Sequence, residues 1–216
     1  MTREEMLMED WLTDGEKKNP LVILAHGAGA GSDSDFMQQM AQLLAARGLY
    51  VVRFDFPYML KRREDGKKRP PDRAPKLLEA YRAVIAEFDR PCVIAGKSMG
   101  GRMASLIATE EEVSAQVKGC VALGYPFHPL GKPENLRIDH LQSIELPMLF
   151  LQGVRDKMGS FEEVSGYPLS EELEIQWLFD GDHDLKPRKA SGISHQRNLE
   201  AAAEAVCAFV KDVLAD

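Results

Sequence analysis

One serine of the sequence is flanked by glycines where an apolar run gives way to an expected helix. Residues 96–101 read Gly-Lys-Ser-Met-Gly-Gly and follow the apolar run 92–95 directly. In a G-x-S-x-G elbow the serine sits on a sharp strand-to-helix turn, and the glycines avoid clashes with neighbouring backbone. The helix N-terminus behind the serine favours developing negative charge. The segment therefore predicts Ser98 as the nucleophile of an acyl-transfer reaction.

Two other interpretations of this segment compete with the first. Gly-Lys-Ser also ends a phosphate-binding loop, but that motif needs a glycine where Pro91 stands and a loop, not a strand, ahead of Gly96. A G-x-S-x-G pattern can also arise by chance at an ordinary strand-to-helix turn. The other residues expected at the site favour the nucleophile.

A glycine-rich stretch after an earlier apolar run offers backbone donors. Residues 26–31 read His-Gly-Ala-Gly-Ala-Gly and follow the run 21–25. Acyl transfer needs two N–H groups for the negative oxygen of its tetrahedral intermediate. We expect them from Met99, which follows the nucleophile, and from Ala28, with Gly27 as the close alternative. A dinucleotide-binding loop is the competing interpretation, but the third glycine of G-x-G-x-x-G is replaced by serine at position 32.

The acid and the base are expected later in the chain. In this arrangement the order is serine, then acid, then histidine. Of the five histidines, His183 alone follows an expected strand, 174–179, in a polar turn ahead of the last expected helix. Asp156 lies just past the expected strand 148–152. We expect His183 to act as the general base and Asp156 to orient it, with Asp182 or Asp184 as the alternative acid.

These residues stand at the ends of alternating elements. Short apolar runs typical of buried strands alternate with longer stretches of helical periodicity. The alternation predicts an α/β fold, with a mostly parallel central sheet covered by helices on both faces. The first twenty residues leave room for a minor antiparallel edge strand. The expected strands are 21–25, 49–54, 92–95, 119–123, 148–152 and 174–179, and the expected helices are 36–47, 75–88, 100–109 and 196–214.

The expected binding pocket is open and shallow. About two dozen residues separate the strands 119–123 and 148–152, too few for a helical lid. Tyr58, Tyr125 and Phe127 are the expected substrate-binding walls. A basic segment from Lys61 to Arg73 is either a solvated loop or a surface that steers an anionic substrate towards the cleft.

Composition limits the remaining possibilities. The 216 residues show no composition break, which favours a single domain spanning 1–216, and a net charge of −7 disfavours nucleic acid as a partner. Cys92, Cys120 and Cys207 lie in apolar stretches, which favours free thiols in a reducing compartment. No Cys/His cluster predicts a metal site, and no cofactor is expected. With neither a signal-peptide pattern nor a membrane-length apolar run, we expect a cytoplasmic protein. Oligomeric state is not readable from the sequence.

Several motifs together resemble a known family. The sequence is similar to the compact α/β-hydrolases that include the testis-expressed hydrolase-like proteins and the hydrolase-like domain of the third regulatory subunit of the NSL chromatin complex. Dienelactone-hydrolase-like enzymes are more distant relatives, and they carry cysteine where this chain has serine. The resemblance covers about nine tenths of the chain and implies an α/β-hydrolase fold without a large cap domain. It rests on 26–29 (His-Gly-Ala-Gly), 53–58 (Arg-Phe-Asp-Phe-Pro-Tyr), 67–72 (Lys-Lys-Arg-Pro-Pro-Asp), 96–102 (Gly-Lys-Ser-Met-Gly-Gly-Arg) and 182–188 (Asp-His-Asp-Leu-Lys-Pro-Arg).

Two functions of different classes follow. The first is a carboxylesterase-like serine hydrolase that cleaves a small carboxylic ester or thioester through an acyl-enzyme intermediate. Its partner is a small-molecule acyl substrate, and an amidase would use the same residues. The second is a catalytically silent scaffold that acts as a binding module, because fold alone does not fix function.

Overall fold

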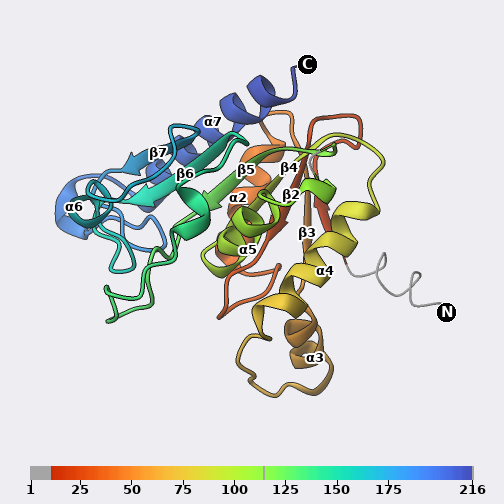
Figure 1. The fold of residues 1–216 in the computed structure, drawn as a ribbon, viewed down its shortest axis with the longest axis horizontal. Coiled ribbons are helices and arrows are strands. Elements are labelled where there is room, and N and C mark those ends of the chain that lie inside the picture. The colour runs from red at the N-terminus through yellow and green to blue at the C-terminus, as the bar shows by residue number, and fades with distance from the viewer. Residues whose placement is uncertain (1–10, 114, 216) are drawn as a thin grey trace.

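A seven-stranded sheet forms the centre of the chain across residues 11–113 and 115–215, the part that the computed structural model describes (Figure 1). The strand order is β1-β3-β2-β4-β5-β6-β7. β1 runs antiparallel to β3, and the other neighbouring strands pair in parallel. The strands are β1 (Leu12–Asp14), β2 (Leu21–Ala25), β3 (Tyr50–Phe54), β4 (Cys92–Lys97), β5 (Val117–Leu123), β6 (Met148–Gly153) and β7 (Leu173–Leu178).

Helices cover both faces of the sheet. The side chains of α4 and α5 pack in one hydrophobic cluster with alternate residues of β2 and β3, and those of α2 and α7 pack in a second cluster with the intervening residues. None of the helices in the described ranges combines the length and the apolar composition that crossing a bilayer requires. The helices are α2 (Asp35–Ala45), α3 (Pro57–Asp65), α4 (Ala74–Ala86), α5 (Met99–Ile107), α6 (Phe161–Val164) and α7 (His195–Val213), with short 3-10 turns η1 (Glu111–Val113), η2 (Asp139–Leu141) and η3 (Lys189–Ser191).

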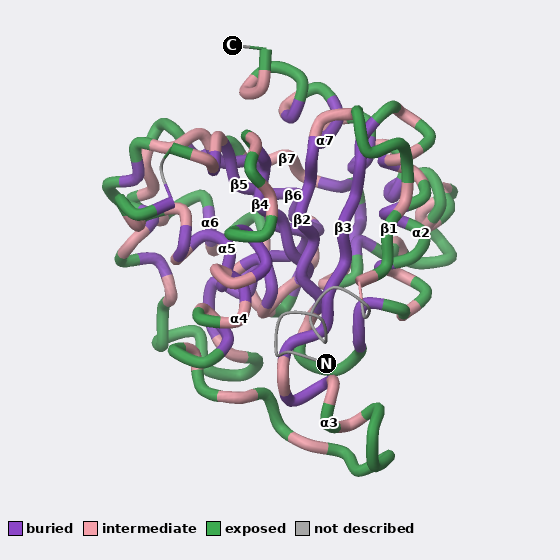
Figure 2. The backbone as a smooth tube through the Cα atoms, turned by 90° about the vertical axis from the view of Figure 1, so that its right-hand side faces the viewer, coloured by how far each residue is buried: buried purple, intermediate pink, exposed green. Residues whose placement is uncertain are grey.

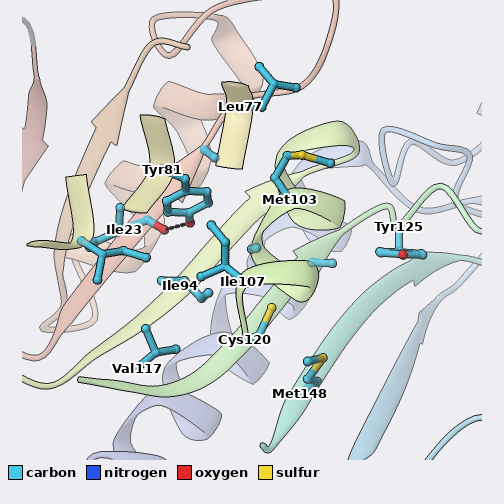
Figure 3. Close-up of a cluster of buried hydrophobic side chains, with 14 of the residues drawn as sticks. Ile23, Leu77, Tyr81, Ile94, Met103, Ile107, Val117, Cys120, Tyr125 and Met148 are labelled. Atoms are coloured by element: carbon cyan, nitrogen blue, oxygen red, sulfur yellow. Dashed lines mark hydrogen bonds between the residues drawn. The ribbon is translucent and has the colours of Figure 1, made fainter. Parts of the chain in front are cut away.

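The central strands are buried away from solvent, as their apolar sequences predict. Every residue of β2, β3 and β4 is buried (Figure 2). In Figure 3, Tyr81 points from α4 onto the sheet, where its hydroxyl lies 2.7 Å from the carbonyl oxygens of Ile23 and Ala95. The same hydroxyl accepts a hydrogen bond of 3.0 Å from the Ala95 N–H. This buried tyrosine ties α4 to the two strands whose ends carry the predicted site.

The chain leaves β2 and β4 towards opposite faces of the sheet. β2 and β4 are neighbours with Ala25 opposite Gly96. The segment after β2 leads to α2 on one face, whereas β4 leads directly to α5 on the other. Divergent loops of this kind open a crevice at the carboxyl edge of an α/β sheet, where ligands bind. The glycine-rich stretch and the elbow are the two sides of that crevice.

The predicted α/β fold is confirmed, with two differences in detail. The ten elements expected from periodicity lie within two residues of the observed bounds. The edge strand is β1, and residues 1–10 lie outside the described part of the chain. The expectation of a solvated loop across 61–73 is wrong for its first half, because α3 continues to Asp65 and projects from the body (Figure 1). Residues 124–147, which join β5 to β6 and are all described, contain η2 and no α-helix.

Candidate active site

Ser98 lies at a strained turn between β4 and α5. Its φ of +50° and ψ of −114° are rare for a residue with a side chain. Two backbone hydrogen bonds of 3.0 Å hold the turn, from the Ser98 N–H to the Leu123 carbonyl and from the Arg102 N–H to the Ser98 carbonyl. A Cβ on Gly100 would lie 2.5 Å from the carbonyl oxygen of Ala25, so glycine is required there. The backbone has the elbow shape that the glycine spacing predicted.

Three side chains expected to work together form one chain of hydrogen bonds. Nε2 of His183 lies 2.8 Å from Oγ of Ser98, and Nδ1 lies 2.8 Å from Oδ2 of Asp156. Because a carboxylate can only accept, Nδ1 carries the imidazole proton, and Nε2 accepts from the Ser98 hydroxyl. The three residues follow β4, β6 and β7, whose parallel pairing brings their carboxyl ends to one edge.

Asp156 is completely buried and fully hydrogen-bonded. Besides His183, its Oδ2 accepts from Nε2 of Gln152 at 2.8 Å, and its Oδ1 accepts from the N–H of Met158 at 2.8 Å. Donors from three directions stabilise the charge away from water. Gln152 was not among the residues expected at the site. The signal that could have found it is a polar residue at the end of the otherwise apolar run 148–152.

The loop that carries His183 packs closely over two strand ends. A Cβ on Gly124 would lie 2.5 Å from the carbonyl oxygen of His183, and a Cβ on Gly153 would lie 2.5 Å from that of Gly181. Gly124 also has a φ of +66°, which glycine adopts without strain. These two glycines, one just after β5 and one at the end of β6, let the loop approach the sheet and set the position of the imidazole.

The alternative acids have other partners. Oδ1 of Asp182 accepts from the N–H groups of Asp184 and Lys186 at 2.9 and 3.0 Å, which closes the turn. The carboxylate of Asp184 lies 3.1 Å from the ammonium of Lys97. Among the acidic residues of the described ranges, Asp156 is therefore the one whose carboxylate contacts the His183 ring.

His26 anchors the start of the glycine-rich stretch. Its Nε2 accepts from the Phe56 N–H at 3.0 Å, so Nδ1 carries the proton and donates to the Gly27 carbonyl at 2.6 Å. Burial lowers the pKa of His26, which favours the neutral ring that this pattern needs. The histidine thus joins the segments that follow β2 and β3.

Side chains of α3 hold the carbonyl groups of this stretch. The Tyr58 hydroxyl lies 3.0 Å from the Ala28 carbonyl and 3.3 Å from the Gly27 carbonyl, and Nη1 of Arg62 donates to the Gly29 carbonyl at 3.1 Å. In a trans peptide the N–H of one residue points away from the carbonyl oxygen of the residue before it. Because the Gly27 carbonyl faces Tyr58, the N–H of Ala28 is directed away from Tyr58. A Cβ built on Gly27 would lie 3.7 Å from Cβ of Ser98, so the stretch runs beside Ser98.

A cleft of about 660 Å³ opens beside Ser98 and His183. This volume lies within the range of sites that bind small molecules. The start of α2 supplies one wall, and Phe36 is its aromatic residue. Other lining residues are Gly27, Ala28, Gln39, Lys97 and Lys186.

The expected substrate-binding walls are corrected by the structure. Tyr125 and Phe127 are completely buried, and the Tyr125 ring stacks on Phe150 at 4.6 Å between centroids. They lie in the hydrophobic cluster on the α5 face because the chain turns inward after Gly124; Figure 3 shows Tyr125 in that cluster. Tyr58 is also buried, and its hydroxyl faces the glycine-rich stretch. None of the three lines the cleft.

Some arginines of the basic segment 61–73 form structural ion pairs. Arg63 forms ion pairs with Asp55 and, at 2.8 Å, with Asp33. The hydrogen bond from Arg63 is the main reason that the pKa of Asp33 is lowered. Arg69 pairs with Asp65 within the projection. The arginines of α3 therefore brace the stretch beside Ser98.

In a second serine–histidine pair the hydrogen bond runs in the opposite direction, from the histidine to the serine. Oγ of Ser105 lies 2.9 Å from Nε2 of His140, but its hydroxyl donates to the Arg102 carbonyl at 2.9 Å. His140 must then donate its Nε2 proton to Ser105. An imidazole that donates cannot take the serine proton, so this pair is structural.

The sheet order, the elbow and the crevice define an α/β hydrolase. Residues 18–211 match the family model described as an alpha/beta hydrolase domain, so the chain belongs to that family.

Solved structures share the fold at low sequence identity. An alpha-beta serine hydrolase homologue from Coxiella burnetii has a TM-score of 0.67 and 17% identity, with 92% of this chain and 90% of that chain covered. Est1E from Butyrivibrio proteoclasticus, bound to ferulic acid, has a TM-score of 0.67 and 19% identity, with 96% of each chain covered. A monoacylglycerol lipase from Paleococcus ferrophilus has a TM-score of 0.67 and 16% identity, covering 94% and 98%.

Proposed function

We propose that the chain is a serine hydrolase that cleaves a small carboxylic ester or thioester. The observation that carries the proposal is the relay from Asp156 through His183 to Ser98, with two hydrogen bonds of 2.8 Å beside a cleft. A buried carboxylate, an imidazole in the correct tautomer and a hydroxyl on a strained turn are the parts that nucleophilic acyl transfer needs.

The reaction proceeds in two stages. Oγ of Ser98 attacks the acyl carbon while its proton passes to Nε2 of His183. The tetrahedral intermediate then expels the alcohol or thiol, which takes the proton from His183, and leaves an acyl-serine. Water attacks this ester with His183 as base, and its collapse releases the carboxylic acid and restores Ser98. Asp156 keeps the imidazole oriented and stabilises its cationic form.

The oxyanion of both intermediates is bound by the N–H groups of Met99 and Ala28. Met99 is the first residue of α5, where helical N–H groups have no intrahelical acceptor. The Gly27 carbonyl faces the Tyr58 hydroxyl, so the Ala28 N–H of the same peptide points away from Tyr58, and Ala28 lines the same cleft as Ser98. The N–H of Gly27 is the alternative second donor.

The substrate is a small uncharged acyl compound. The cleft volume suits a small molecule, and the charges in its wall balance, because Asp35 and Asp184 oppose Lys97 and Lys186. The esterase and lipase named among the similar structures are consistent with an oxygen ester. A net charge of −7 argues against nucleic acid. Within the family, we group the chain with the compact testis-expressed and NSL-complex type on the motifs described above.

A fluorophosphonate probe tests the activity directly. Labelling of the wild type, and none of Ser98→Ala, is the expected result, because only an activated serine attacks the phosphorus. Absence of labelling in a folded wild type would favour the silent scaffold. A series of p-nitrophenyl esters of increasing chain length then measures the size of the acyl pocket.

A further inference from the structure

Lys97, the residue before the nucleophile, is a buried lysine with three partners. It is 7% exposed. Its Nζ donates to the backbone carbonyl of His183 at 2.8 Å and lies 3.1 Å from Oδ1 of Asp184. The ring centroid of Phe36 lies 5.4 Å from the same atom, close enough for a cation–π contact. The ammonium thus joins the end of β4, the start of α2 and the loop after β7.

We propose that Lys97 is a positioning residue that holds the His183 loop against the nucleophile elbow. The proposal rests on the function given above and adds a residue to its machinery. Lys97 and Ser98 are adjacent, so the bond from Nζ to the His183 carbonyl ties the base to the element that carries the nucleophile. It spans 86 positions of the chain.

Gly124 leaves room for the hydrogen bond between Lys97 and the His183 carbonyl. A Cβ on Gly124 would lie 3.3 Å from Nζ of Lys97 and 2.5 Å from the His183 carbonyl oxygen. Glycine at this position therefore makes room for the ammonium and the carbonyl together.

The ammonium of Lys97 is engaged by protein groups and is not free to bind substrate. An ammonium has three N–H donors. One points to the carbonyl of His183, one to the carboxylate of Asp184, and the Phe36 ring covers a further side. Burial lowers the pKa of Lys97, and Asp184 opposes that shift. The group is therefore held in place by protein partners, although it borders the cleft.

Four variants test the proposal. Lys97→Met removes the charge and the donors but keeps the length of the side chain, and Lys97→Arg restores a cation. Asp184→Asn removes one partner at an exposed position. Lys189→Met removes an exposed lysine of η3 and serves as the control. Each is measured for kcat and KM on a p-nitrophenyl ester across pH, and for the NMR resonance of the His183 Nδ1 proton.

Lys97→Met is expected to lower kcat by about ten- to a hundredfold with KM within twofold, as the loss of a charged hydrogen bond implies. The resonance of the His183 Nδ1 proton should weaken in the same variant. Lys97→Arg should recover part of kcat and part of the resonance. The carboxylate of Asp156 contacts the imidazole, and Lys97 and Asp184 lie beside it. Lys186 and His195 line the same cleft, and Asp182 lies in the same turn; these three are unchanged in all four variants. Removing the cation moves the rise of kcat/KM to higher pH, whereas Asp184→Asn moves it to lower pH.

The proposal is overturned if Lys97→Met keeps the wild-type kcat and Nδ1 resonance, or if it raises KM alone. If Lys97→Met does not fold, an unchanged pH profile in folded Asp184→Asn overturns it. The NMR signal does not require turnover, so failure of the positioning role is separable from failure of the hydrolase assignment, which the probe reports.

Discussion

The side-chain amide of Gln152 donates a hydrogen bond of 2.8 Å to the carboxylate of Asp156, four residues later. Oε1 of the same amide accepts from the Tyr125 N–H at 2.7 Å. A single buried amide thus links the acid of the relay to the backbone after β5. The carboxylate reaches His183 in a fixed orientation because Gln152 and Met158 hold its two oxygens.

Gln152→Met tests this link. The substitution removes the donor and leaves the buried Tyr125 N–H without its acceptor. We expect kcat to fall about tenfold and the free energy of unfolding to fall by about 1–3 kcal/mol. Gln116→Met is the matched control, because Gln116 donates to the carbonyls of Ile85 and Phe88, away from the cleft. The Gln116→Met variant should lose stability and keep the wild-type kcat. Equal kcat in both variants would mean that Asp156 does not need the amide.

Tyr58→Phe tests the support that α3 gives to the glycine-rich stretch. Loss of the hydroxyl frees the carbonyls of Gly27 and Ala28, and the Ala28 N–H, which shares a peptide with the Gly27 carbonyl, is then held less firmly. We expect kcat to fall several-fold, by roughly 1 kcal/mol of transition-state stabilisation, with KM little changed. Tyr167→Phe, far along the chain in the turn after α6, should match the wild type. An effect confined to KM would instead give Tyr58 a role in substrate binding.

Gly124→Ala tests the close approach of the His183 loop. The new methyl group would overlap the His183 carbonyl, so the imidazole must move and kcat/KM should fall by more than tenfold. Gly131→Ala is a matched control, because Gly131 has a similar φ of +72° but open space around it. Both variants should lose about 1–2 kcal/mol of stability from backbone strain. Wild-type kcat/KM in Gly124→Ala would show that activity does not depend on how closely the His183 loop approaches the sheet.

Stability should fall as the pH is lowered from neutrality. Burial lowers the pKa of His26, and it lowers the pKa of His140 from 6.5 to about 4. Below pH 6.5 the unfolded chain therefore binds protons that the folded chain does not, and stability decreases as the pH falls towards 4. Thermal unfolding across this range should show a shallower slope in His140→Asn. An identical slope would mean that His140 is not protonated on unfolding.

The convergence of Ser98, Asp156 and His183 could be predicted because it depends on the sheet. Strands paired in parallel bring their carboxyl ends to one edge, so side chains that follow β4, β6 and β7 lie at the same edge. The walls of the cleft could not be predicted in this way. Tyr125 and Phe127 follow a strand as Asp156 does, but the turn at Gly124 sends them into the core. Gln152 was missed because it ends the apolar run 148–152, where the pattern indicates packing. Lys97 was missed because it stands between Gly96 and Ser98, in a motif where the serine alone was assigned chemistry.

A double-mutant comparison tests most directly whether Ser98 and His183 act as one unit. The measurement is kcat for ester hydrolysis by Ser98→Ala, His183→Ala and the variant carrying both. Each single substitution should lower kcat by roughly 10⁴-fold or more, and the double variant should be no slower than the slower single variant. Losses that multiply in the double variant, or a His183→Ala protein with wild-type kcat, would contradict the relay.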